Sequence, residues 1–267
     1  MRAEVEFLRA VKADVVVGDV PALAFESANQ AGIVSMAVAN FGWDWVLDYY
    51  AQHDSRWHPV ISQYQQAYGK CDVLMRLPFH ESCQSFANIK DASLLVRRVL
   101  AARQEIRKRL GWAEDQKVVL LSFGGFVGGD LGFSDCDAAG DFLTASFEPK
   151  PSGYRGPWQK LDRDLGFRSV DLVAACDAVI SKPGYGIISE CLAYSVPLLL
   201  LPRRNYPESA ILLGGLSNES GMAEMPEQDF FEGRWKEHLD RLRPNNFSSR
   251  PERQNSDERI AQEILDL

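Results

Sequence analysis

Residues 171–203 of the chain read DLVAACDAVISKPGYGIISECLAYSVPLLLLPR, and the order of elements in this segment indicates the fold class. Its pattern predicts a helix that ends at Cys176, a buried strand at 177–181, a glycine-containing turn at 182–186, a second helix, and another buried strand at 197–202. Short, continuous apolar strands are typical of parallel sheets that are covered on both faces. The order therefore predicts half of an α/β domain, with a ligand at the carboxyl ends of its strands.

The turn at 182–186 has the backbone chemistry of an anion site. Gly184 and Gly186 lack a Cβ and can adopt positive φ, so N–H groups can approach phosphate oxygens at the start of a helix expected near Gly186. Glu190 follows one helical turn later, where its carboxylate can accept hydrogen bonds from two ribose hydroxyls. An isolated G-x-G is more often an ordinary turn, and Glu190 is then a solvated helical residue. These residues alone leave both interpretations open.

A wider set of residues carries a family resemblance. A strand ends in Ser181, a Gly-containing turn follows, Ser189-Glu190 lies in the next helix, and an Ala-x-x-x-Pro step starting at Ala193 leads into a strand that ends at Pro202. This set resembles the donor-binding signature of GT-B glycosyltransferases, in particular family 28 enzymes like the bacterial N-acetylglucosaminyltransferase of peptidoglycan precursor synthesis.

The resemblance extends over nearly the whole chain. Residues 92–111 resemble the helix that precedes the C-terminal domain of these enzymes, and 118–125 (VVLLSFGG) resemble that domain's first strand and glycine turn. The chain is most similar to the glycosyltransferase-like N-terminal region of plant L-arabinokinases. The segments that carry this similarity are VVVGDVPALAFESANQAGI (15–33), NFGWDW (40–45), RLP (76–78) and KPGYGIISE (182–190).

The resemblance implies an α/β, GT-B-like fold with two Rossmann-like lobes. We expect residues 1–95 to form a partial N-terminal, acceptor-side lobe and residues 96–267 to form the C-terminal, donor-binding lobe. The apolar pattern predicts helix, strand, helix and strand at 2–13, 14–17, 21–30 and 33–38, an order that rarely opens an α/β domain. The sequence contains no HGxGH-like loop, so we expect the N-terminal lobe to be incomplete by on the order of 100 residues.

The same resemblance implies the candidate site residues. The donor-binding candidates are Ser122, Gly124, Gly125, Lys182, Gly184, Tyr185, Gly186, Ser189, Glu190, Arg203 and Glu208, and the acceptor-side candidates are Asp19, Trp43 and Asp44. Gly124-Gly125 is equally well explained as a tight turn. The aromatic residues at 41–50 are better explained by packing than by acceptor binding. The segment after Pro202 departs from the Gln-rich version of the family, so the sugar stays open.

Composition narrows the class of protein. The chain has 267 residues, 46% of them hydrophobic, and a formal net charge of −8, which does not favour nucleic acid as a partner. Five cysteines without paired spacing indicate reduced thiols and a cytoplasmic location, and Cys71, Cys176 and Cys191 are expected in the core. The apolar runs are too short to span a membrane. His53 and His58 lack partners at metal-ligand spacing, so neither a metal nor a cofactor is predicted.

Three functions fit these observations. The first is transfer of a hexosyl or N-acetylhexosaminyl group from a uridine-diphosphate sugar to an unknown acceptor, with an unidentified base, and we expect this chain alone to bind the donor without transferring its sugar. The second is a non-catalytic nucleotide-sugar binding or regulatory module. The third, less favoured, is a sugar-nucleotide epimerase. An exposed sheet edge in an incomplete lobe also predicts self-association. Residues 126–170 are expected to hold at most one strand, at 142–147, and 259–266 a short helix.

Overall fold

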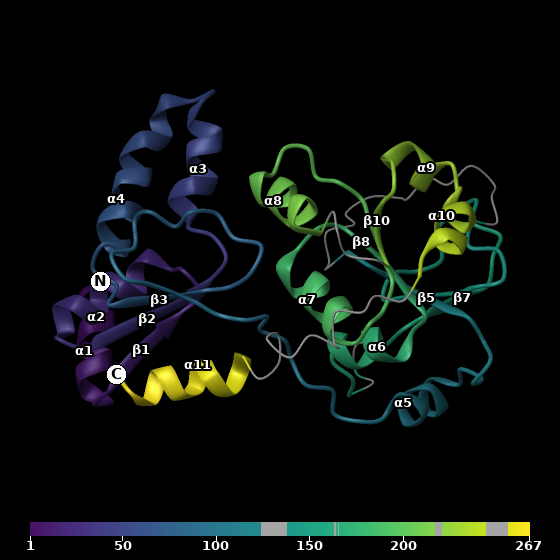
Figure 1. Cartoon of the computed structure of the whole chain (residues 1–267), viewed down its shortest axis with the longest axis horizontal. Coiled ribbons are helices and arrows are strands. Elements are labelled where there is room, and N and C mark those ends of the chain that lie inside the picture. Colours follow the sequence, from purple (N-terminus) through teal and green to yellow (C-terminus); the bar gives the residue numbers. More distant parts are fainter. Residues whose placement is uncertain (124–137, 163, 165, 217–220, 244–255) are drawn as a thin grey trace. The chain divides into compact units, whose positions relative to one another are not determined.

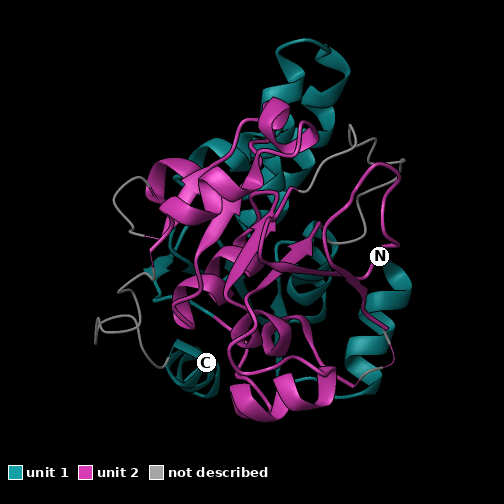
Figure 2. Ribbon diagram, turned by 90° about the vertical axis from the view of Figure 1, so that its right-hand side faces the viewer, with its two compact units in different colours: residues 1–95, 206–211, 252–267 teal, residues 96–205, 212–251 magenta. Residues whose placement is uncertain are grey.

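The computed structural model of the chain describes residues 1–123, 138–162, 164, 166–216, 221–243 and 256–267. The chain divides into two units, each with its own parallel sheet (Figures 1 and 2). Unit 1 comprises Met1–Leu95, Tyr206–Ile211 and Glu252–Leu267, and unit 2 comprises Val96–Asn205 and Leu212–Pro251.

Unit 1 is built on a four-stranded sheet in the order β1-β2-β3-β4, and all its strand pairs are parallel. The strands are β1 (Val15–Gly18), β2 (Val34–Ala39), β3 (Val73–Arg76) and β4 (Ile89–Asp91). The helices are α1 (Arg2–Ala10), α2 (Ala22–Ala31), α3 (Trp43–Ala51), the short 3-10 helix η1 (Ser55–Trp57), α4 (His58–Tyr68) and α11 (Ser256–Leu265). Because sequential strands lie side by side, the carboxyl ends of β1, β2 and β3 meet at one edge of the sheet.

An aromatic cluster forms the core of unit 1. Helix α2 follows Pro21 and ends at Gly32, which adopts the left-handed conformation with φ 75°. The helix buries Phe25, whose ring meets those of Tyr68 and Phe86 edge to face, while the Tyr68 and Phe86 rings stack with centroids 4.5 Å apart. This packing fixes α2, α4 and the segment after β3 against the sheet.

Unit 2 is built on a six-stranded parallel sheet in the order β10-β9-β8-β5-β6-β7. The strands are β5 (Val118–Ser122), β6 (Leu143–Ser146), β7 (Trp158–Lys160), β8 (Ala178–Ser181), β9 (Leu198–Leu200) and β10 (Met222–Glu224). The helices are α5 (Arg103–Leu110), α6 (Ser169–Ala175), α7 (Tyr185–Ala193), α8 (Pro207–Leu216), α9 (Glu227–Phe231) and α10 (Trp235–Arg241), and the first turn of α8 belongs to unit 1.

The sheet of unit 2 is covered on both faces. Val119, Ile180 and Leu199 of one face pack in a cluster with Phe230 of α9 and Trp235 of α10. Alternate strand residues point to the opposite face, where α6 and α7 lie (Figure 1). Such two-sided cover explains why the strands of unit 2 are continuous apolar runs in the sequence.

The α/β class and the two Rossmann-like lobes are confirmed by the two separate parallel sheets. The burial of Cys71, Cys176 and Cys191 is confirmed as well. The expected helix at 92–111 is wrong over its first half, because only Arg103–Leu110 is helical and residues 97–100 are hydrogen-bonded to α6 and α7 instead. The expectation of at most one strand within residues 126–170 is also wrong, because both β6 and β7 lie there.

Candidate functional site

The best-defined candidate site of unit 2 lies where the strand order reverses. From β5 the chain adds β6 and β7 on one side and then returns to place β8 on the other side of β5. The last residues of the two central strands, Ser122 and Ser181, are neighbours in the register, and Ser181 Oγ donates to the carbonyl oxygen of Ser122 at 2.5 Å. In open parallel sheets, ligands bind at the carboxyl end of such a switch point.

The turn after β8 presents the start of α7 at this switch point. Gly184 is the N-cap of α7, with φ −163° and ψ 142°, and no side chain among the described residues forms a capping hydrogen bond at the helix start. Neither glycine uses the positive φ that is open to it, because Gly184 is extended and Gly186 lies inside the first turn of the helix. A Cβ built on either glycine would meet nothing within 4 Å. Packing within the described chain therefore does not require glycine at either position, and space is left above the first turn of α7.

Two cationic side chains lie at the ends of neighbouring strands. Lys182 follows β8 directly, and Arg203 follows the parallel partner strand β9. Desolvation, together with the positive charge of Arg203, lowers the pKa of Lys182. An anion between them would relieve this repulsion.

Glu190 lies one turn into α7 and is buried, with 4% of its surface exposed. Its Oε2 accepts a hydrogen bond from Ser169 Oγ at 3.2 Å, and its Oε1 lies 4.0 Å from a guanidinium nitrogen of Arg97. Burial raises the pKa of Glu190, and the contacts with Ser169 and Arg97 act in the opposite direction. The sequence analysis missed both partners, because Ser169 and Arg97 lie 21 and 93 residues before Glu190 and no local pattern links them to it.

The structure places the other predicted donor residues in different surroundings. Ser189 is buried, and its Oγ donates to the carbonyl oxygen of Gly186 in its own helix. Glu208 belongs to unit 1, where Asn40 Nδ2 donates to its Oε1 at 3.4 Å. Tyr185 is the first residue of α7 and is partly exposed. Gly124 and Gly125 lie outside the described residues.

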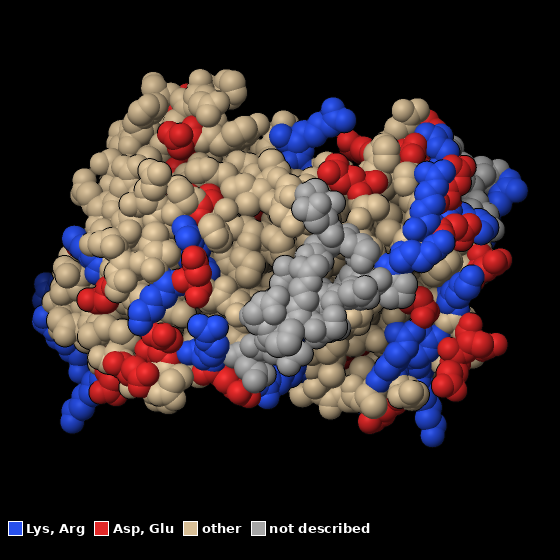
Figure 3. All heavy atoms as spheres, in the orientation of Figure 1, with Lys and Arg blue, Asp and Glu red and all other residues tan. Residues whose placement is uncertain are grey.

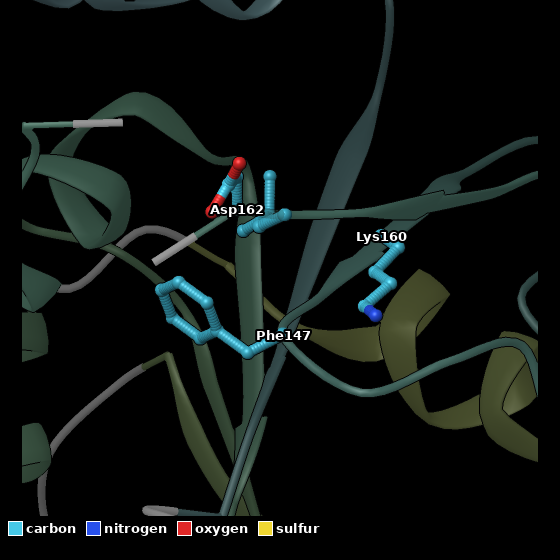
Figure 4. Close-up of a pocket in the computed structure, with 4 residues that line it drawn as sticks. Phe147, Lys160 and Asp162 are labelled. Carbon is cyan, nitrogen blue, oxygen red and sulfur yellow. The ribbon is translucent and has the colours of Figure 1, made fainter. Parts of the chain in front are cut away.

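A cavity of about 490 Å³ opens at the carboxyl ends of β6 and β7. It is lined by Phe147, which follows β6, Lys160 at the end of β7, and Leu161 and Asp162 just beyond (Figure 4). None of these four belongs to the donor set predicted from the sequence. The cavity shares the carboxyl edge of the sheet with the turn after β8, so the two features open along the same edge.

The acceptor-side candidates lie at the carboxyl edge of the sheet of unit 1. Asp19 follows β1, and burial raises its pKa. Trp43 is 36% exposed and begins α3, and its ring meets that of Phe41 edge to face at 5.6 Å. Asp44 is buried, and its Oδ2 accepts a hydrogen bond from Ser85 Oγ at 2.5 Å. Burial also raises the pKa of Asp44, against the effect of Ser85.

Two buried side chains that the sequence analysis missed hold these loops. Tyr68 Oη donates to the carbonyl oxygen of Val20 at 2.9 Å and accepts from the N–H of Trp43 at 3.0 Å. Glu81 accepts from the N–H of Gly42 at 3.3 Å and from the N–H of Cys83 at 2.6 Å. The loops that follow β1, β2 and β3 are thus tied to one another within unit 1.

Charged side chains are distributed unevenly over the face of the molecule that Figure 3 shows. Figure 3 shows acidic and basic residues intermixed over unit 2 and few of either sign over α3 and α4. In the part of the chain that the structure describes, no helix is both long and apolar enough to span a bilayer.

Solved structures with this architecture define the class of fold. A UGT transferase from Siraitia grosvenorii in complex with UDP aligns over 99% of this chain and 85% of its own, with a TM-score of 0.64 and 14% identity. The glycosyltransferase VinC in complex with DTDP aligns over 98% of this chain and 70% of its own, with a TM-score of 0.57 and 15% identity. The chain therefore has the GT-B glycosyltransferase fold.

One curated relative is similar in sequence as well. L-arabinokinase from Arabidopsis thaliana is 34% identical over 250 residues, which cover 90% of this chain. The chain spans only 23% of the length of that relative. No protein-family model matches the chain.

Proposed function

We propose that the chain binds a uridine-diphosphate sugar at the turn after β8 and is a nucleotide-sugar-dependent glycosyltransferase. The observation that carries the proposal is the uncapped start of α7 at the strand-order reversal, with two glycines that packing does not require. The backbone N–H groups of the first turn and the positive end of the helix dipole favour a diphosphate there. Solved structures of the same fold in complex with UDP and with DTDP support this choice of ligand.

Each predicted group has a role in this binding mode. The diphosphate lies over Gly184 and Gly186, where a side chain would occupy its space. Lys182 and Arg203 provide positive charge at the ends of two adjacent strands. Glu190 accepts hydrogen bonds from the ribose hydroxyls.

In this binding mode the start of α7 also assists transfer of the sugar. As the bond between the anomeric carbon and the diphosphate breaks, negative charge grows on the leaving oxygen, and the N–H groups of α7 stabilise it. An acceptor hydroxyl attacks the anomeric carbon and loses its proton. Asp19 and Asp44, at the carboxyl edge of unit 1, are acceptor-side candidates, and the base is unassigned.

The alternative is a non-catalytic module that binds a nucleotide sugar. The similarity to L-arabinokinase favours this second candidate, because that relative is named for a kinase activity rather than for glycosyl transfer. Incubation of the chain with labelled UDP-sugars and a panel of sugar and lipid acceptors separates the two. Acceptor-dependent release of UDP supports the transferase and overturns the expectation that this chain alone binds the donor without transferring its sugar, whereas binding without release agrees with that expectation and favours the module.

Calorimetric titration with UDP-glucose tests the site itself. Glu190→Ala is expected to weaken binding by about 1.5–3 kcal/mol, about 10- to 150-fold, the range for a hydrogen bond to a charged group. Glu190→Gln is expected to recover part of the loss. Glu237→Gln removes the same charge from an exposed position on α10 and serves as the matched control. Unchanged affinity in both Glu190 variants would remove this residue from the site.

Gly186→Ala is the second arm of this experiment. Because an added Cβ meets nothing within 4 Å, and alanine is favoured over glycine in a helix by up to about 1 kcal/mol, the variant is expected to be as stable as the wild type or more stable. Its affinity for UDP-glucose is expected to fall, because the methyl group enters the space assigned to the diphosphate. A variant that binds as well as the wild type would place the diphosphate elsewhere.

A further inference from the structure

Residues 97–100 of unit 2 form a segment that is hydrogen-bonded to Asp171 of α6, to Arg168 just before α6 and to Tyr194 just after α7. Tyr194 Oη donates to the carbonyl oxygen of Arg97 and accepts from the N–H of Val99, each at 3.0 Å. Asp171 Oδ1 accepts from the N–H of Leu100 at 2.7 Å. Arg168 also donates to the carbonyl oxygen of Arg98. Four hydrogen bonds therefore fix the backbone of a segment that has no regular secondary structure.

This docking brings one side chain to the candidate ribose site. The guanidinium of Arg97 lies 4.0 Å from Glu190 Oε1, and 67% of the Arg97 side chain is exposed, against 6% of the Glu190 side chain. The opposite oxygen of the carboxylate is held by Ser169 Oγ. One oxygen thus contacts a neutral hydroxyl, and the other faces a cation that water can reach.

We propose that Arg97 is a positioning residue for the nucleotide site, held by the docked segment so that the Glu190 carboxylate stays ionised and oriented to accept two ribose hydroxyls. The inference rests on the proposed function. It assigns Arg97 a role through Glu190 and requires no contact between Arg97 and the nucleotide.

The charges around Glu190 set the direction of the expected effect. Burial raises the pKa of Glu190, and the hydrogen bond from Ser169 and the charge of Arg97 lower it. On α6, Asp171 acts to raise the pKa and Arg168 acts to lower it. Without Arg97, fewer groups counteract the increase that burial causes in the pKa of Glu190, so Glu190 takes up a proton at a higher pH than in the wild type. The protonated acid is a poorer acceptor for two hydroxyls.

The experiment compares wild type, Arg97→Gln and the charge-matched control Arg241→Gln on α10. The affinity for UDP-glucose is measured by calorimetry between about pH 5 and pH 8. UDP-glucose is used because both of its phosphates are esterified and bind no proton in this range, whereas the terminal phosphate of UDP does. As the pH is lowered from about 8 to about 5, we expect the affinity of Arg97→Gln to fall up to about fivefold further than the affinity of wild type. This is the range for a largely exposed ion pair. The control is expected to follow wild type. Tyr194→Phe, which loosens the segment, is expected to be intermediate.

A second readout is independent of binding. The titration of the Glu190 carboxyl carbon, followed by NMR in the ligand-free protein and assigned with Glu190→Gln, is expected to give a higher pKa in Arg97→Gln than in wild type. An unchanged pKa, or a pH profile of affinity identical to that of wild type, overturns the role of Arg97. Failure of the wild type to bind UDP-glucose overturns the proposed function instead, and the NMR titration still shows whether Arg97 controls the ionisation of Glu190.

Discussion

Arg107 is the residue of α5 whose loss should destabilise unit 2 the most. It is 3% exposed, and its guanidinium donates to three carbonyl oxygens: Ala175 at 2.8 Å, Ala113 at 2.7 Å and Gln116. It also lies 3.4 Å from Asp177 Oδ2. These contacts hold the end of α6, the approach to β5 and the start of β8 together.

The expected cost of Arg107→Met follows from these contacts. Each of the three carbonyl groups loses a charge-assisted bond worth about 1.5–3 kcal/mol, which sums to about 4.5–9 kcal/mol. Methionine fills part of the volume, and a buried guanidinium no longer has to be desolvated, so we expect a net loss of about 3–5 kcal/mol in the free energy of unfolding. That is a large fraction of the roughly 5–15 kcal/mol typical of a whole domain.

Urea unfolding followed by tryptophan fluorescence measures this loss. Trp112 is a suitable reporter because the Arg107 guanidinium lies 5.9 Å from the centre of its ring. Arg103→Met is the matched control: Arg103 also donates to the carbonyl oxygens at the end of α6 and to Asp177, but 38% of its side chain is exposed, so water can replace its bonds. We expect the control to lose about 1 kcal/mol. If Arg107→Met were no less stable than Arg103→Met, burial would not be the reason for the effect.

Two further predictions concern single buried groups. Tyr68→Phe keeps the ring packing but leaves one carbonyl and one N–H of the unit 1 loops without their partner, so we expect the free energy of unfolding, measured by heat or urea, to fall by about 1–3 kcal/mol. A loss below about 0.5 kcal/mol would show that these loops find other partners. Asp171 is buried; burial alone would raise the pKa of Asp171, but hydrogen bonds from the N–H groups of Leu100 and Arg168 outweigh this effect and lower it. A folded-state pKa below the unfolded value contributes stability at neutral pH that is lost as the pH falls through the folded pKa. Asp171→Asn should therefore lower the free energy of unfolding most near pH 7 and least below about pH 4. A difference from wild type that does not change with pH would contradict this assignment.

The sequence predicted the elements that local patterns determine. The order of strand, glycine turn and helix at 177–190 was visible because apolar runs and glycines are adjacent in the chain, and the structure has β8 and α7 there. The first half of 92–111 was mispredicted because the family resemblance implied a helix there, whereas Tyr194 and Asp171 form hydrogen bonds with residues 97–100, which have no regular secondary structure. Tertiary contacts of this kind override local propensity and leave no trace in a short window.

The partners of the candidate site residues were not predictable, for a related reason. Glu190 was identified by its spacing from the glycines, but its ionisation depends on Ser169 and Arg97, which reach it through the packing of α6 and of an irregular segment. The same holds for Asp44, whose partner Ser85 is 41 residues away. A single sequence shows which groups can act on a ligand, and only the fold shows which groups control their charge.

The two units also differ in where backbone strain is stored. Among the described residues, five that are not glycine have positive φ, and three of them, Val20, Phe79 and Cys83, lie in the loops after β1 and β3 of unit 1. Such conformations cost about 1–3 kcal/mol each and persist only where the surroundings fix them. Tyr68 and Glu81 provide that constraint through buried hydrogen bonds to the same loops. The turn at 182–186, the proposed donor turn of unit 2, contains no residue with positive φ, because Gly184 is extended and Gly186 is helical. If the proposed function holds, substitutions in the loops after β1 and β3 should therefore change stability and acceptor choice together.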